Sequence, residues 1–137
     1  MASVQFFTEK ISFKVPRPRK TIQWLKQVCL AEGKPLGSLT YVFCSDAYLR
    51  TLNKKFLNHS TLTDILSFPS GDSSAVDGEI YISIPRIKEN SKIYAQPFER
   101  ELRRVMVHGL LHFMGYGDKT ASEKAKMREK EEAYLSL

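Results

Sequence analysis

A long amphipathic helix is predicted between Pro97 and Met114, and it needs a core to pack against. Proline is tolerated at the first position of a helix. The apolar residues that follow recur at helical spacing, at Leu102, Val105, Met106, Leu110 and Phe113. A stripe of this kind makes a helix stable only when it is buried against other elements. The chain has 137 residues, which is enough for one such core, so we predict a single domain over residues 1–137.

Short strands and helices are predicted to mix along the chain without strict alternation. Helices are expected over 21–31, 46–56, 86–94 and 97–114, and a last one opens at a capping box, Thr120-Ala-Ser-Glu123. Strands are expected over 4–7, 11–15, 38–43, 64–68 and 78–84, with a turn at 8–10 joining the first two. This order predicts an α+β fold, in which one small mixed sheet packs with about five helices.

Charge and composition narrow the classes of partner. The formal net charge is +6 and the sequence pI is about 9.4, which favours polyanions and nucleic acid first. No apolar run is long enough to span a membrane, and the N-terminus lacks the pattern of a secretory signal. We expect a cytoplasmic protein that contacts no membrane. Cys29 and Cys44 form no C-x-x-C motif, so they are interpreted as buried free thiols.

The segment V-H-G-L-L-H-F-M-G-Y-G-D combines two histidines with a turn and a carboxylate. His108 and His112 are four residues apart, so their rings project from one face of the helix. Gly109 stands where H-E-x-x-H peptidases carry their glutamate, which argues against a protease of that type. Gly115 can turn the chain just past the helix end, so that Asp118 can reach back. Three such ligands leave a fourth position open, as catalytic zinc sites do.

A second interpretation of this segment needs no metal. A buried helix can carry a hydrogen-bonded histidine pair and end at a glycine for structural reasons alone. Histidine pairs at this spacing are common enough that the residues by themselves leave both interpretations open.

Three motifs in this sequence resemble those of the YbeY family, bacterial metalloproteins of ribosomal RNA processing. The family signature H-G-x-L-H-x-x-G-Y-D-H corresponds here to residues 108–118. The family's second motif, L-N-x-x-[FY] followed by a short loop and T-[DN]-[VI]-L-S-F-P, corresponds to residues 52–56 and 63–69. Its Gly-acid-Ile-x-Ile strand corresponds to residues 78–82. All three occur in the family's order and together span about half of the chain, so one YbeY-like domain is expected over residues 1–137.

The resemblance implies one Zn²⁺ per chain, held by His108, His112 and Asp118. The family has a third histidine where Asp118 falls in a gapless alignment, and aspartate oxygen is an acceptable zinc ligand. If a gap is allowed, Lys119 takes that position, and lysine is a poor ligand. A second departure is Leu57, which stands where the family usually carries an arginine with a proposed role in catalysis or RNA contact.

The implied activity is single-strand-specific endoribonuclease cleavage that matures the 3′ end of small-subunit ribosomal RNA and serves ribosome quality control. The partners would be ribosomal RNA and the small ribosomal subunit. The attacking group would be a metal-bound water. The residues identify no general base; Asp64 and Glu79 are the weak candidates. Basic side chains could hold the RNA, and five are candidates: Lys54, Lys55, Arg86, Arg103 and Arg104.

Two other functions remain open from the sequence. The chain could be a ribosome-associated RNA-binding or assembly factor with a structural metal and little turnover, and Leu57 favours this alternative. It could also be a zinc hydrolase of another substrate. The last helix is interpreted as a solvated, charged element that packs through Ala125, Met127 and Tyr134.

Overall fold

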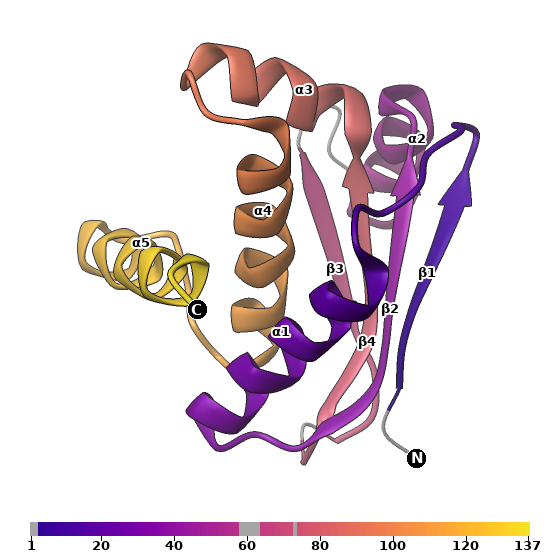
Figure 1. Ribbon diagram of the computed structural model, residues 1–137. Helices are drawn as coiled ribbons and strands as arrows, with labels where there is room; N and C mark the ends of the chain where they lie inside the picture. The colour runs from indigo at the N-terminus through magenta and orange to yellow at the C-terminus, as the bar shows by residue number, and fades with distance from the viewer. Residues whose placement is uncertain (1–2, 58–63, 73) are drawn as a thin grey trace.

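A four-stranded mixed sheet carries the helices of this protein, as seen in a computed structural model that describes residues 3–57, 64–72 and 74–137 (Figure 1). The strands are β1 (Ser3–Glu9), β2 (Leu36–Cys44), β3 (Ile65–Pro69) and β4 (Val76–Ser83). Their spatial order is β1-β2-β4-β3. The pairs β1–β2 and β2–β4 are parallel, and β3 lies antiparallel to β4 at one edge. The predicted α+β class with one small mixed sheet is confirmed.

Five helices surround the sheet within the part of the chain that the structure describes. They are α1 (Pro18–Glu32), α2 (Asp46–Leu57), α3 (Ile84–Ile93), α4 (Phe98–Phe113) and α5 (Ala121–Leu135). Helices α1 and α4 lie across one face of the sheet, and α5 packs on the side of α4 away from the sheet (Figure 1). None of the described helices is both long and apolar enough to cross a membrane.

The main core forms between α1, α4 and the facing side of the sheet. The predicted stripe of α4 supplies buried Leu102, Met106 and Leu110, which belong to the same cluster as Ile80 and Ile82 of β4. A smaller cluster lies on the opposite face, where Leu49 of α2 meets Leu66 of β3. Alternation along each strand therefore decides which side chains face α4 and which face α2.

The segment 11–15 is not a strand, which corrects the prediction of an N-terminal hairpin. β1 pairs in parallel with β2 instead, and the chain turns at Lys10, whose φ is 61°. The alternating apolar residues have another cause: Phe13 packs against Phe43 at 5.2 Å and against Phe98 at 6.1 Å between ring centroids. An irregular segment that crosses the end of a core can show the same alternation as a strand.

Side chains cap the N-termini of both α2 and α5, and the cap of α5 is the one predicted from the sequence. The hydroxyl of Ser45 accepts a hydrogen bond from the backbone N–H of Tyr48 at 3.1 Å. At α5, Thr120 and Glu123 form the predicted capping box. Residues 58–63, among them the histidine at position 59, lie outside the described residues.

Gly78 of β4 is expected to be the glycine that least tolerates a side chain. Its φ is 147°, and an added Cβ would lie 2.4 Å from the carbonyl oxygen of Phe68. We predict that Gly78→Ala lowers the free energy of unfolding by at least about 3 kcal/mol, because backbone strain adds to a clash with backbone.

The control for this prediction is Gly33→Ala, at a φ of 69° with no atom within 4 Å of the added Cβ. This change should cost only about 1 kcal/mol. Chemical denaturation of both variants measures the difference, and equal losses would contradict the prediction.

Candidate metal centre

The two histidines lie on the exposed flank of α4, beside the turn that ends the helix. Gly109, between them in sequence, faces the sheet; a Cβ there would lie 2.8 Å from Ile65 Cδ1 and 3.1 Å from two carbons of Ile80. This close approach holds α4 against β3 and β4, and it fixes the direction in which His108 and His112 project. The imidazole Nε2 atoms lie 3.0 Å apart.

The turn after α4 returns Asp118 to the histidines. Gly115 has a φ of 100° and starts the turn. Glu123 of α5 then accepts backbone hydrogen bonds from Lys119 and Thr120, both at 3.0 Å. These bonds anchor the chain directly after Asp118. Asp118 Oδ2 lies 3.2 Å from His108 Nε2 and 3.4 Å from His112 Nε2.

The hydrogen bonds of the outer ring nitrogens decide which nitrogen of each histidine is free. His112 Nδ1 lies 2.9 Å from the carbonyl oxygen of Tyr116, which can only accept, so Nδ1 carries the proton. His108 Nδ1 lies 2.5 Å from the carboxylate of Glu131, so it donates as well. Both Nε2 atoms therefore direct lone pairs toward each other and toward the Asp118 carboxylate.

This arrangement of three acceptors fits a small cation. Three lone-pair atoms at 3.0, 3.2 and 3.4 Å repel one another unless a positive charge lies between them. Ligands about 2.0–2.1 Å from a tetrahedral Zn²⁺ are separated by about 3.3–3.4 Å, close to the observed triangle. Among the residues described, His108, His112 and Asp118 are the group whose ligand atoms lie close enough together to hold a metal ion. The structure thus brings Asp118, rather than Lys119, to the histidines.

The centre is open to solvent on one side. The side chains of His108, His112 and Asp118 are 18%, 29% and 41% exposed. A structural zinc site is usually closed by four protein ligands, whereas a catalytic site keeps one position accessible. Three ligands at a solvent-facing position match the second kind of site.

Glu131 is a buried partner of the candidate metal centre that the sequence analysis missed. It is 4% exposed, and its two oxygens contact His108 Nδ1 and Arg104 Nη1, the latter at 3.2 Å. Arg104 in turn binds the buried carboxylate of Glu101 through two hydrogen bonds, at 2.6 and 3.0 Å. A buried chain of alternating charge therefore extends from the candidate ligand His108 into the protein. Carboxylates in this position orient metal-binding histidines and raise their basicity.

The spacing of the buried residues along α5 could have indicated that Glu131 is buried. Met127, Glu131 and Tyr134 are buried, at intervals of four and three residues, so they share one face of the helix. The prediction that α5 packs through Met127 and Tyr134 is confirmed. The same prediction for Ala125 was wrong, because Ala125 is exposed. A carboxylate that lies between two buried positions on the same face of a helix is expected to be buried too, and it then needs a positively charged or hydrogen-bonding partner.

A second cluster ties the metal-site turn to α1. The Glu32 carboxylate accepts a hydrogen bond from Tyr116 Oη at 2.6 Å, and it also contacts Lys130 Nζ at 3.1 Å and Tyr134 Oη. The hydrogen bonds to Tyr116, Tyr134 and Lys130 hold the pKa of Glu32 below its usual value despite its partial burial. Glu32 therefore anchors Tyr116, the residue whose carbonyl fixes the tautomer of His112.

Metal affinity is expected to fall steeply as the pH is lowered. Burial by itself would lower the pKa of His108, but Glu131, Asp118 and Asp64 outweigh it and raise the pKa above the usual histidine value. Protonated His108 cannot bind a metal. As the pH is lowered, the loss of metal affinity should therefore begin at a higher pH than it does at a site whose histidines have the usual pKa. Metal titrations across the range around neutral pH measure this, and an affinity independent of pH down to the ordinary histidine pKa would contradict it.

The two weak candidates for a general base are in different places. Asp64 contributes to the raised pKa of His108, and burial raises its own pKa. It therefore lies in the electrostatic neighbourhood of the histidines and stays a candidate. Glu79 projects from β4 on the face opposite Ile80, where it accepts a hydrogen bond from Tyr81. Because Ile80 faces α4, Glu79 is on the far side of the sheet and is not brought to the histidines.

The five basic candidates for RNA contact are dispersed. Lys54 and Lys55 are exposed in the last turn of α2, ahead of Asp64 in the chain. Arg86 pairs with Asp46 at 3.2 Å, and Arg104 is engaged by the buried carboxylates described above. Arg103 lies over the ring of Trp24. The structure does not bring these side chains into one patch, and their contact with RNA stays a prediction.

Comparison with known proteins gives one consistent result. A family model described as Endoribonuclease YbeY matches residues 4–137. A Flavobacterium psychrophilum protein named endoribonuclease YbeY is 44% identical over 96% of this chain and 94% of its own length. One of the same name from Amoebophilus asiaticus is 42% identical over 98% of this chain and 92% of its own length.

A solved structure agrees with the sequence relatives. The solution structure of TM1509 from Thermotoga maritima matches with a TM-score of 0.71 at 26% identity, covering 98% of this chain and 87% of that one. The resemblance identified from three short motifs is therefore matched along nearly the whole length of the sequence. The chain that carries this His-His-Asp centre belongs to the YbeY family.

Proposed function

We propose that this protein is a metal-dependent endoribonuclease that cleaves single-stranded RNA during ribosomal RNA processing. The observation that carries the proposal is the convergence of three acceptor atoms, within 3.0–3.4 Å of one another, at a solvent-facing position on α4. The relatives named endoribonuclease YbeY support RNA as the substrate. The formal net charge of +6 favours a polyanion as well.

Each residue of the centre has a defined task in this proposal. His108, His112 and Asp118 would hold one Zn²⁺, with Glu131 and the Tyr116 carbonyl fixing the orientation of the two rings. The ion, when bound, supplies Lewis-acid chemistry that activates water and offsets charge on a phosphodiester in its transition state. Asp64, whose charge acts on His108, would accept the proton. Lys54 and Lys55 would attract the RNA backbone toward the centre.

The finer assignments are those that the resemblance to the YbeY family implies. We place the cleavage at the 3′ end of small-subunit ribosomal RNA, with the small ribosomal subunit as partner and the cytoplasm as the site of action. Quality control of ribosomes would use the same centre. A direct test is to expose purified small subunits with unprocessed RNA to this protein and map the new ends.

The basic activity is tested on single-stranded and double-stranded RNA of the same sequence. The proposal expects cleavage of the single strand alone, its loss after chelation, and its return when Zn²⁺ is restored. The His112→Ala variant should stay inactive when Zn²⁺ is added. Cleavage that survives both chelation and His112→Ala would overturn the proposal.

A second candidate function is an RNA-binding assembly factor with little turnover. Leu57 favours it, because the family usually has an arginine at this position. The Leu57→Arg variant separates the two candidates. If the natural protein binds RNA without cutting it and the variant cuts it, the assembly role is favoured; if the natural protein already cuts it, the endoribonuclease role is favoured.

A further inference from the structure

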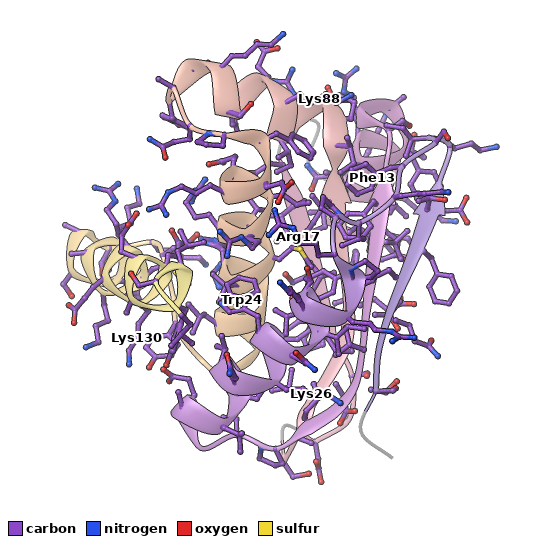
Figure 2. The ribbon with its side chains drawn as sticks, in the orientation of Figure 1. Phe13, Arg17, Trp24, Lys26, Lys88 and Lys130 are labelled. Carbon is purple, nitrogen blue, oxygen red and sulfur yellow. The ribbon has the colours of Figure 1, made fainter. Side chains whose placement is uncertain are left out.

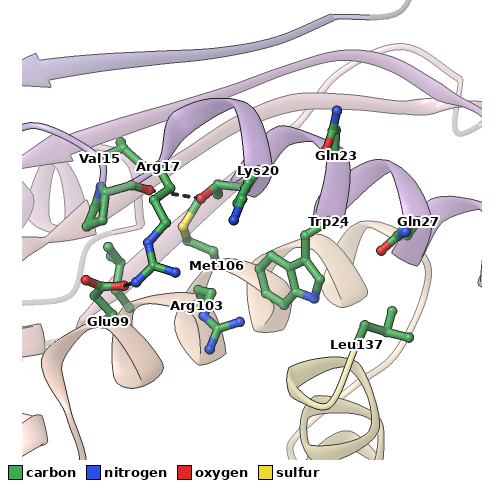
Figure 3. Close-up of a pocket in the computed structure, with 13 residues that line it drawn as sticks. Val15, Arg17, Lys20, Gln23, Trp24, Gln27, Glu99, Arg103, Met106 and Leu137 are labelled. Atoms are coloured by element: carbon green, nitrogen blue, oxygen red, sulfur yellow. Dashed lines mark hydrogen bonds and ion pairs between the residues drawn. The ribbon is translucent and has the colours of Figure 1, made fainter.

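A cavity of about 390 Å³ lies between α1 and α4, away from the candidate metal centre (Figure 3). On α4 it is lined by Glu99, Leu102, Arg103 and Met106. Arg103 and His108 are five residues apart and so project about 140° apart around the helix. The cavity therefore faces a different side of α4 from the histidines, and none of its lining residues belongs to the candidate metal centre.

The cavity has an apolar floor and a basic rim. Trp24, Leu102 and Met106, all nearly buried, lie beneath the cavity as its floor, while Arg17, Lys20 and Arg103 contribute the positive charge. The volume falls in the range of small-molecule sites, which pair apolar walls with a few converging polar groups. The exposed amides of Gln23 and Gln27 add hydrogen-bonding groups to the same wall of α1 (Figure 3).

The positive charge of the cavity is not balanced by its own acids. Glu99 is the acidic side chain of the lining, and it pairs with Arg17 at 3.2 Å. Neither Lys20 nor Arg103 has a carboxylate partner in the part of the chain that the structure describes. The first turn of α1, which begins at the cavity, also carries no acidic residue that would offset its helix dipole. Arg17, Lys20 and Arg103 against Glu99 leave two positive side-chain charges in excess, and the carboxylate of the last residue, Leu137, which also lines the cavity, reduces the excess to one.

Trp24 gives the site a defined surface. Its indole N–H donates to the Tyr134 carbonyl at 2.7 Å, which fixes the plane of the ring. Arg103 lies over that ring, with its guanidinium 5.6 Å from the ring centre. A guanidinium stacked in this way keeps its N–H edge free for an anion, and arginine pairs with phosphate through two such N–H groups.

We propose that this cavity is a second phosphate-binding site, which takes the phosphoryl group of a nucleotide through Arg103 and Lys20. The nucleoside part would lie on the apolar floor beside Trp24. The nucleotide is either free or part of an RNA chain, and the two sources share the same chemistry. This site is independent of cleavage at the metal centre.

Trp24 is the one tryptophan of the sequence, so its fluorescence reports on this cavity alone. The probe is uridine 5′-monophosphate, with uridine as the ligand that lacks a phosphate. We expect saturable quenching by the nucleotide and much weaker quenching by the nucleoside. Arg103→Gln and Lys20→Gln should each weaken the nucleotide affinity roughly tenfold or more, as expected for loss of a charged hydrogen bond.

The matched control for Lys20→Gln is Lys26→Gln. Like Lys20→Gln, it removes one positive charge from α1, but Lys26 does not line the cavity (Figure 2). It should leave the affinity unchanged, and His112→Ala should leave it unchanged too. Equal quenching by uridine, or equal losses in Lys26→Gln and Arg103→Gln, would overturn the proposal. Loss of binding in His112→Ala would place the nucleotide at the metal centre instead, which also overturns it.

A short oligouridylate in the same titration distinguishes the two sources. If the oligonucleotide binds more tightly than the mononucleotide and depends equally on Arg103, the site holds an RNA chain. If the mononucleotide binds as tightly, the site takes a free nucleotide. Both outcomes require the phosphate contact, and a failure of the oligonucleotide to depend on Arg103 would count against it.

Discussion

His112→Ala is expected to abolish metal binding in a one-to-one complex. The change removes one corner of the triangle formed by His108 Nε2, His112 Nε2 and Asp118 Oδ2, and the two remaining ligands cannot define a site. Losing a partner that only orients a ligand already costs roughly 10- to 100-fold in metal affinity, so losing a ligand should cost more. Competition with a chromophoric zinc chelator measures the affinity of both proteins.

The stability of the metal-free proteins controls for misfolding. His112 is partly exposed and its Nδ1 contacts a backbone carbonyl in the same turn, so the metal-free variant should unfold within about 1 kcal/mol of the metal-free natural protein. Added Zn²⁺ should raise the melting temperature of the natural protein and leave that of the variant unchanged. A variant that keeps its zinc affinity would show that His112 is not a ligand.

Glu131→Gln is expected to lower zinc affinity by roughly 10- to 100-fold while leaving all three ligands in place. Glutamine keeps the size of the side chain but removes the negative charge that His108 Nδ1 and Arg104 contact. His108 then loses basicity at Nε2. The metal-free protein should also lose about 1–3 kcal/mol of stability, because Arg104 keeps its ion pair with Glu101 but exchanges a buried carboxylate for a neutral amide as its second partner.

Glu129→Gln is the matched control, on the same helix but with an exposed carboxylate. It should change neither zinc affinity nor stability to a measurable degree. Visible spectra of the Co²⁺-substituted proteins add a readout independent of activity, since a reoriented His108 changes the ligand field. Equal zinc affinity in the natural protein and Glu131→Gln would show that the contact is structural only.

Local patterns were sufficient to predict most of the elements and part of the metal centre. The stripe from Leu102 to Phe113 predicted α4, and the strand predicted over 78–84 corresponds to β4, except that Ile84 begins α3. Residues within one helix and its turn could also be placed from spacing, which is why His108, His112 and Asp118 were found together. These features depend on contacts within a few turns of the chain.

Features that depend on distant segments were not predictable in the same way. Phe13 alternates with its neighbours as in a strand, yet it covers the end of the core beside Phe98. Glu131 lies in a helix whose charged side chains were interpreted from the sequence as exposed to solvent, and its partner His108 is 23 residues away in sequence. Glu79 had the right chemistry for a base, but the alternation of β4 sends it to the opposite face. Its position follows from which face of the sheet α4 covers.

The metal content of the natural protein and of Asp118→Ala tests the central claim most directly. Both are purified without a metal-binding tag, exposed to Zn²⁺, and freed of excess ion before elemental analysis. We predict close to one zinc per chain in the natural protein and a large loss in the variant, because Asp118 Oδ2 closes the triangle of ligands. No zinc in the natural protein, or a full complement in Asp118→Ala, would contradict the His-His-Asp centre.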